Sequence, residues 1–149
     1  MEHKIIDTKE VVIRFTGDSG DGMQLTGTLF ADASALYGNE ISTFPDYPAE
    51  IRAPQGTVAG VSGFQVHIGQ TEVKTPGDFC DVLVAMNPAA LKANAKWAKP
   101  GASIILDEDS FDEKGLEKAG FKTNDPIEEM NLKDYHIVWA PITSLTKES

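Results

Sequence analysis

The sequence predicts an α/β fold, a three-layer α/β/α sandwich around a mostly parallel, Rossmann-like sheet. Apolar runs typical of strands alternate with helical patterns along the chain, as a parallel sheet requires. A glycine-rich loop at residues 17–24 stands between the first apolar run and an amphipathic helix. Residues 82–86 form a continuous apolar run, which is typical of a central parallel strand covered on both faces.

Length and composition indicate one domain, residues 1–149. Of the 149 residues, 41% are hydrophobic, which is enough for a core. A chain of this size buries roughly two-thirds of its unfolded surface on folding.

The first strand is expected at residues 11–15, and a helix follows the glycine-rich loop. Gly38 is placed to end this helix as a left-handed cap. Gly27 in its first turns would let the helix lie close to the sheet. The apolar side of the helix consists of Leu25, Leu29, Ala33 and Leu36 or Tyr37.

Residues 40–60 interrupt the alternation, because they contain Pro45, Pro48 and Pro54. They predict a long ordered loop, which in a compact domain is usually functional or an interaction surface. Arg52 is the only Lys or Arg between residues 15 and 73, against seven acidic residues. An ion pair with Glu50 would explain Arg52, and a contact with a carboxylate or phosphate across an interface is the alternative.

The second half continues the pattern. Residues 61–68 predict a strand with Phe64, Val66 and Ile68 on one face and the polar Gln65 and His67 on the other. The remaining predicted elements are the central strand 82–86, a helix from Pro88 through Trp97 closed by Pro100-Gly101, a strand at 103–106, a short helix near 112–119 and a last strand at 135–140.

The glycine-rich loop predicts close approach of backbone amides to a ligand at a helix N-terminus. Its glycines run G-x-x-G-x-G, however, and Met23-Gln24 stand where a P-loop has Lys and Ser or Thr. Asp18 and Asp21 would also repel a phosphate at short range. The loop therefore predicts binding but argues against a stand-alone nucleotide site.

Composition narrows the possible partners. A net charge of −10 and a pI near 4.6 disfavour nucleic acid and anionic membranes. Cys80 is the only cysteine, which excludes an internal disulfide and cysteine-rich zinc or iron–sulfur sites, and its context favours a buried residue over a reactive thiol. With no signal-peptide pattern and no apolar run of membrane-spanning length, we expect a cytoplasmic protein.

Three other groups of residues do not predict a metal site or a nucleophile. The acidic run at residues 107–112 lacks the turn glycine of a calcium loop and fits a solvated strand-to-helix connection. His3, His67 and His136 show no ligand spacing, and Ser19 lacks the G-x-S-x-G context of a hydrolase nucleophile. No catalytic or metal-binding residue is therefore assigned to the chain.

Five segments carry a resemblance to a known family. They are GDSGDGMQLTG at 17–27, PDYPAEIRAP at 45–54, GVSGFQ at 60–65, TPGD at 75–78 and VAMNPAAL at 84–91. In this order they resemble the gamma domain of 2-oxoacid:ferredoxin oxidoreductases, most closely the form fused at the front of the alpha subunit of 2-oxoglutarate:ferredoxin oxidoreductase. Many pyruvate-branch relatives have Arg-Gly-Gly where this chain has Arg52-Ala53-Pro54, which favours the 2-oxoglutarate branch.

The resemblance implies an enzyme that oxidatively decarboxylates a 2-oxoacid with thiamine diphosphate, reduces ferredoxin through iron–sulfur clusters and forms acyl-coenzyme A. Its implied partners are the remaining alpha part, the beta subunit and ferredoxin, and the chain alone should be inactive. The gamma domain is associated with the coenzyme A side. The candidate cofactor-binding residues are Gly17, Asp18, Ser19, Gly20, Asp21, Gly22, Met23, Gln24 and Arg52.

Two alternatives remain at this point. The chain could be a small-molecule-binding or regulatory α/β domain that uses the 17–24 loop, or a module that serves only subunit assembly. Residues 141–146 read as a strand end followed by a helix start, so we expect an N-terminal piece of a longer subunit.

Overall fold

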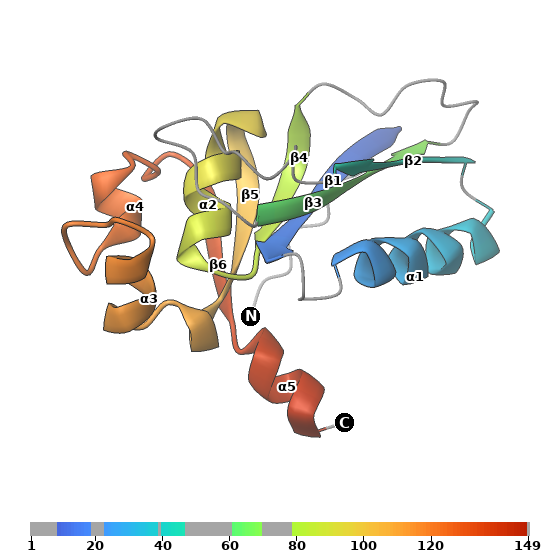
Figure 1. The fold of residues 1–149 in the computed structure, drawn as a ribbon. Helices are drawn as coiled ribbons and strands as arrows, with labels where there is room; N and C mark the ends of the chain where they lie inside the picture. The colour runs from blue at the N-terminus through green and yellow to red at the C-terminus, as the bar shows by residue number, and fades with distance from the viewer. Residues whose placement is uncertain (1–8, 19–22, 39, 47–60, 70–78, 149) are drawn as a thin grey trace, which may run out of the picture.

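A computed structural model describes residues 9–18, 23–38, 40–46, 61–69 and 79–148. They form a six-stranded sheet in the order β2-β3-β1-β4-β5-β6 (Figure 1). The strands are β1 (Glu10–Asp18), β2 (Glu40–Asp46), β3 (Val61–Gly69), β4 (Cys80–Ala85), β5 (Ala98–Asp107) and β6 (His136–Ala140).

The sheet is mostly parallel, as predicted. β1, β4, β5 and β6 pair in parallel, whereas β3 runs antiparallel to both β1 and β2. The predicted loop at 40–60 is wrong in its first part, because residues 40–46 form β2 at the edge of the sheet. Pro45 is compatible with an edge strand, where a missing N–H costs no ladder hydrogen bond on the open side. Residues 47–60 lie outside the described residues.

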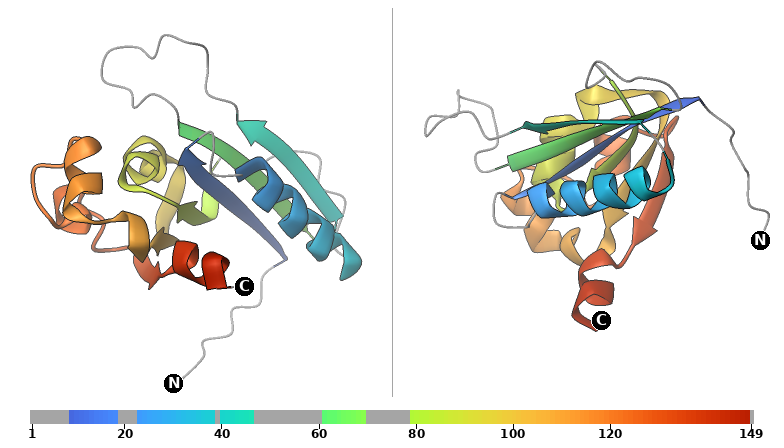
Figure 2. Two further views of the ribbon diagram at one scale, coloured as in Figure 1. Left: turned by 60° about the horizontal axis from the view of Figure 1, so that its bottom comes forward. Right: turned by 90° about the vertical axis from the view of Figure 1, so that its right-hand side faces the viewer.

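Helices on both faces of the sheet complete the three predicted layers (Figure 2). One face carries α2, with α3 packed against α2; the other carries α1 over β1, β3 and β2, and α5. The helices are α1 (Met23–Leu36), α2 (Pro88–Asn94), α3 (Glu113–Lys118), α4 (Pro126–Glu129) and α5 (Ile142–Glu148), with 3₁₀ turns η1 (Ala95–Trp97) and η2 (Glu108–Ser110).

The two faces of the sheet have separate cores. Under α2, Leu83, Ile104 and Leu106 are fully buried and pack with Leu91 of the helix. Under α1, a smaller cluster contains Phe15, Phe64, Val66 and Ala31. The core is therefore completed under α2 and is thinner on the face that carries α1.

The predicted apolar side of α1 is wrong. Leu25, Leu29 and Leu36 are 63%, 59% and 89% exposed, and the helix packs through the small residues Gly27 and Ala31 instead. A Cβ atom at Gly27 would lie 2.0 Å from Cδ1 of Phe64, so the prediction of a close approach at Gly27 is confirmed. This close approach admits only small side chains, and it turns the leucines away from the sheet.

Other local predictions are confirmed or corrected. Gly38 ends α1 with a φ of +82°, as expected for a left-handed cap. Pro100-Gly101 does not close the preceding helix, because β5 already begins at Ala98 and the register with β4 shifts along this stretch. Gly101, within this stretch, has a φ of +78°, a conformation that glycine adopts readily. α4 was not predicted, and no helix in the described ranges is long and apolar enough to span a membrane.

Candidate functional site

The candidate site lies at the carboxyl ends of β1 and β4, which are neighbours in the sheet. The helix after β1 packs on one face, and the helix after β4 packs on the other. The two helices that follow these strands therefore lie on opposite faces of the sheet, which makes this position a topological switch point. Ligands of open α/β folds commonly bind at this topological switch point.

Asp18 and Asn87 meet at this edge. Asp18 is the exposed last residue of β1, and Nδ2 of Asn87 donates a hydrogen bond of 3.0 Å to its Oδ1. Oδ1 of Asn87 accepts a 2.8 Å hydrogen bond from the backbone N–H of Ala90 and so caps α2. Because both ends of the Asn87 amide are used, the side chain links the last residue of β1 to the start of α2.

The structure covers only part of the predicted loop site. Gly17 is buried near the end of β1, and Asp18 follows it. Met23 and Gln24 begin α1, although their side chains are not described. The predicted site residues outside the described ranges are Ser19, Gly20, Asp21, Gly22 and Arg52.

Asn87 is a site residue that the sequence-based reasoning did not single out. The signal was present, because Asn87 precedes Pro88 directly after a buried strand. Asn at an N-cap followed by Pro in the first turn is a common helix start. Only the pairing of β1 with β4 places this cap beside Asp18.

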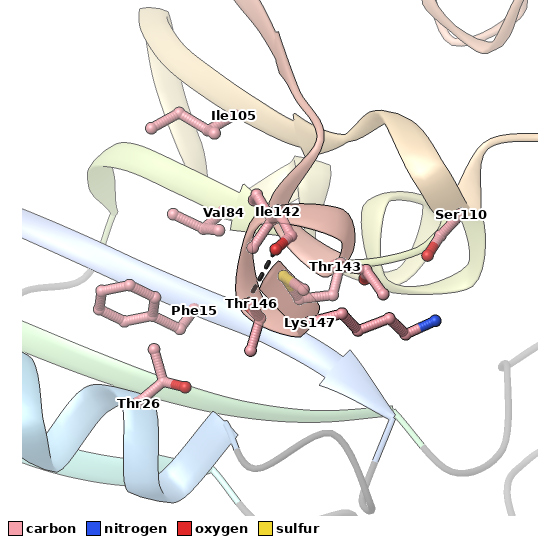
Figure 3. A pocket seen from close by; sticks show the side chains of 10 residues that line it. Phe15, Thr26, Val84, Ile105, Ser110, Ile142, Thr143, Thr146 and Lys147 are labelled. Atoms are coloured by element: carbon pink, nitrogen blue, oxygen red, sulfur yellow. Dashed lines mark hydrogen bonds between the residues drawn. The ribbon is translucent and has the colours of Figure 1, made fainter. Parts of the chain in front are cut away.

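A cavity of about 600 Å³ opens on the face that carries α1 and α5 (Figure 3). Its floor is apolar and comes from the central strands and the turn after β4. The floor residues are Phe15, Val84, Met86 and Ile105. The walls are formed by Thr26 of α1, by Ser110, and by Ile142, Thr143, Thr146 and Lys147 of α5.

The acidic run at residues 107–112 is a strand-to-helix connection with Glu108, Asp109 and Asp112 exposed, as predicted, but Asp107 is buried, and Asp107 and Asp109 bind α5. Asp107 is fully buried and accepts hydrogen bonds from Oγ1 and the backbone N–H of Thr143 and from Oγ of Ser110. Asp109 accepts two 2.8 Å hydrogen bonds from the N–H and Oγ of Ser144. These bonds lower the pKa of Asp109.

Cys80 and His67 are both buried in the fold. Cys80 is fully buried, which confirms the prediction of a buried cysteine, and burial raises the pKa of its thiol to about 11. His67 lies on the face opposite Phe64, as predicted, but it is buried, and its Nε2 lies 3.0 Å from Oε2 of Glu10. Among the described residues, no three His, Cys, Asp or Glu side chains gather in a way that could hold a metal ion.

Comparison with protein families gives a match over almost the entire chain. Residues 12–149 match the family described as pyruvate ferredoxin/flavodoxin oxidoreductase. Over 138 residues, 93% of the chain, the sequence is 53% identical to 2-oxoglutarate oxidoreductase subunit KorA of Mycobacterium tuberculosis. It is also 29% identical, over 72% of the chain, to the common gamma subunit of the pyruvate/ketoisovalerate oxidoreductases of Thermococcus litoralis. The chain spans 21% of the length of the first relative and 57% of the second.

Solved structures with the same fold include two oxidoreductase proteins. The 2-oxoglutarate:ferredoxin oxidoreductase of Magnetococcus marinus, solved with 2-oxoglutarate, coenzyme A and succinyl-CoA bound, aligns with 95% of this chain and 22% of its own, at 27% identity and a TM-score of 0.69. A keto/oxoacid ferredoxin oxidoreductase gamma subunit from Geobacter sulfurreducens aligns with 94% of this chain and 65% of its own, at 23% identity and a TM-score of 0.64. At 23% identity, the similarity to the Geobacter protein shows a shared fold alone.

Proposed function

This chain belongs to the pyruvate ferredoxin/flavodoxin oxidoreductase family, and on that basis we propose that it is one domain of a 2-oxoglutarate:ferredoxin oxidoreductase. The proposed enzyme converts 2-oxoglutarate and coenzyme A to succinyl-CoA and CO₂ and passes two electrons to ferredoxin. The observation that carries the proposal is the 53% identity to a 2-oxoglutarate oxidoreductase subunit across 93% of the chain. Arg52-Ala53-Pro54, in place of the Arg-Gly-Gly of many pyruvate enzymes, supports the same substrate.

The side chains of this chain do not supply the ligands that the iron–sulfur clusters and thiamine diphosphate of such an enzyme need. An iron–sulfur cluster requires several thiolates, and the sequence has one cysteine, Cys80, which is buried and has a raised pKa. Thiamine diphosphate is held through a divalent cation, and the described part of the chain gathers no three acidic or histidine side chains for one. We therefore assign these groups to the remaining alpha part and the beta subunit, in a cytoplasmic complex.

We assign two roles to this domain: contact with the other subunits during assembly and a contribution to the coenzyme A-binding side of the complex. The position of the 17–24 loop after β1, at the topological switch point, supports this assignment. The exposed carboxylate of Asp18 would repel the phosphates of coenzyme A, so the phosphates need a cation beside them. Arg52 is the nearest basic residue in the sequence to this loop on its C-terminal side, and a guanidinium suits bidentate contact with phosphate or carboxylate.

The complete enzyme tests the proposal. The subunit that carries this sequence would be purified with its partner subunits, and reduction of a viologen dye would be followed with 2-oxoglutarate or pyruvate, with and without coenzyme A. We expect 2-oxoglutarate-dependent reduction that requires coenzyme A, and no activity from the purified 149-residue chain alone. Preference for pyruvate, or activity of the chain by itself, would contradict the proposal.

Arg52 gives a sharper test of the coenzyme A assignment. We expect Arg52→Ala to raise the KM for coenzyme A or to weaken subunit association, and Arg52→Lys to restore little of either, because an ammonium cannot form a bidentate contact. The unfolding midpoint of the chain should change little, since an exposed ion pair contributes about 0–1 kcal/mol. A large loss of stability in a variant whose complex remains fully active would instead make Arg52 an internal structural residue.

A further inference from the structure

Hydrogen bonds of two kinds join the carboxyl end of β1 to the turn between β4 and α2. The inner ones involve Thr16, which is fully buried: its Oγ1 donates to the carbonyl oxygen of Val84, and its own carbonyl oxygen accepts from the N–H of Met86, both at 2.9 Å. The outer one is the 3.0 Å bond from Nδ2 of Asn87 to Oδ1 of Asp18, which links two side chains at the surface.

The outer bond is not needed to form the sheet or the helix. Parallel pairing of β1 with β4 already extends from Ile13 opposite Val82 to Thr16 opposite Ala85. A single hydrogen bond between side chains that water also reaches adds little to stability, because folding exchanges it for hydrogen bonds to water. The cap of α2 requires only an acceptor, which Ser, Thr or Asp would supply as well as Asn.

Asn87 differs from these other capping residues in having a donor and an acceptor on two different atoms of one short side chain. Its Oδ1 accepts from the N–H of Ala90 at 2.8 Å while its Nδ2 donates to Asp18. A serine has one hydroxyl oxygen, which the cap would occupy, and an aspartate would repel the carboxylate of Asp18. Among these capping residues, only Asn caps α2 and fixes the carboxylate of Asp18 at the same time.

Asp18 is the last residue of β1, where the chain enters the rest of the glycine-rich segment. Only four residues separate it from Met23, at which α1 begins. α1 is itself held close to the sheet, because Gly27 closely approaches the ring of Phe64. A short segment between two fixed ends loses less conformational entropy when a ligand orders it, and this favours binding.

We propose that Asn87 is a positioning residue for the coenzyme A side of the enzyme. Its amide fixes the carboxylate of Asp18, and with it the start of the glycine-rich segment, at the topological switch point between β1 and β4. Asn87 acts through Asp18 and not by contact with coenzyme A. The inference rests on the proposed function, in which residues 17–24 belong to the coenzyme A side.

Three variants of the complete enzyme test this role. Asn87→Ser keeps a cap for α2 but removes the donor to Asp18, and Asn87→Asp keeps the cap but places two carboxylates together. The double variant Asn87→Asp/Asp18→Asn reverses the pair, because an amide at position 18 can donate to a carboxylate at position 87, and the net charge equals that of the parent. Asp125→Ser is the matched control: Asp125 also caps a helix, α4, through the N–H three residues further on, and it also directly precedes a proline.

Dye reduction gives kcat and the KM values for coenzyme A and 2-oxoglutarate, and isothermal titration calorimetry gives the Kd for coenzyme A. We expect Asn87→Ser to raise the KM and Kd for coenzyme A about tenfold and to change kcat and the KM for 2-oxoglutarate less than about twofold. Asn87→Asp should weaken coenzyme A binding at least as much, and the reversed pair should return to within about threefold of the parent. Asp125→Ser should leave all four constants within about twofold of the parent.

Measuring binding as well as activity separates this inference from the proposed function. If the parent is active with 2-oxoglutarate and Asn87→Ser leaves the KM and Kd for coenzyme A unchanged, the inference is overturned and the function stands. If the parent binds coenzyme A but oxidises no 2-oxoacid, the function is refuted, and weaker binding by Asn87→Ser still supports the positioning role. A parent that binds no coenzyme A overturns both.

A merely structural role for Asn87 gives a different pattern. Asn87→Ser would then lower kcat and raise both KM values together, with a thermal midpoint of unfolding well below that of Asp125→Ser, and this result overturns the inference. A reversed pair that binds coenzyme A no better than Asn87→Asp also overturns it, because restoring the hydrogen bond would then have no effect on binding.

Discussion

Replacing Gly27 by Ala should destabilise the domain, although helix propensity alone predicts the opposite. Ala in a helix interior is favoured over Gly by about 1 kcal/mol. In the structure, however, a Cβ atom at Gly27 would lie 2.0 Å from Cδ1 of Phe64, whereas ordinary van der Waals contact begins at 3.4 Å. The helix or the ring must therefore move by about 1.4 Å, the difference between these distances, and Phe64 is buried in a cluster with Phe15 and Val66.

Overpacking of this kind costs up to about 3 kcal/mol, which leaves a net loss of about 2 kcal/mol after the gain in propensity. This corresponds to about a thirtyfold smaller folding equilibrium constant. Urea unfolding of the purified chain, followed by circular dichroism, measures the effect, and Asp32→Ala on the exposed side of α1 is the matched control that changes propensity without a clash. If Gly27→Ala is as stable as the parent or more stable, α1 does not approach β3 as closely as the structure indicates.

Three further predictions concern single side chains. The pKa of Asp109 is lowered in the fold from its ordinary value of 3.8, so its hydrogen bonds to Ser144 stabilise α5 above that pH and are lost as the pH falls through the lowered pKa. Hydrogen exchange in α5 should therefore become faster on acidification of the parent. In Asp109→Asn, which has no carboxylate to protonate, this pH-dependent change should be absent. The thiol of Cys80, with its pKa raised to about 11, should resist a maleimide at pH 8 until the chain is unfolded in urea, and rapid labelling of the native chain would show that it is accessible. Asn87→Asp should keep the cap of α2 but place two carboxylates together and lower the unfolding free energy by about 1 kcal/mol, and adding Asp18→Asn should recover the loss. A double variant no more stable than the single one would indicate that this contact does not link β1 to α2.

The order and type of most elements followed from the sequence, because they depend on local patterns. The apolar run at residues 82–86 became the central strand β4, Gly38 ended α1, and residues 88–97 became α2 and η1. The strand before the glycine-rich segment and the helix after it were predicted correctly, although Gly17 and Asp18 belong to β1 and Met23 and Gln24 to α1. The family, too, could be identified from short segments in a fixed order.

The tertiary structure alone decided which faces are buried and which distant residues meet. The leucines of α1 point away from the sheet because the close approach of Gly27 to Phe64 selects small residues, a constraint that the apolar pattern of the helix does not contain. Strand order brings Asn87 beside Asp18, although 69 residues separate them. The apolar row of Phe15, Val84, Ile105 and Val138 likewise appears only when the strands are paired in register. Local chemistry determines helices and strands, but the burial of a face depends on what packs against it.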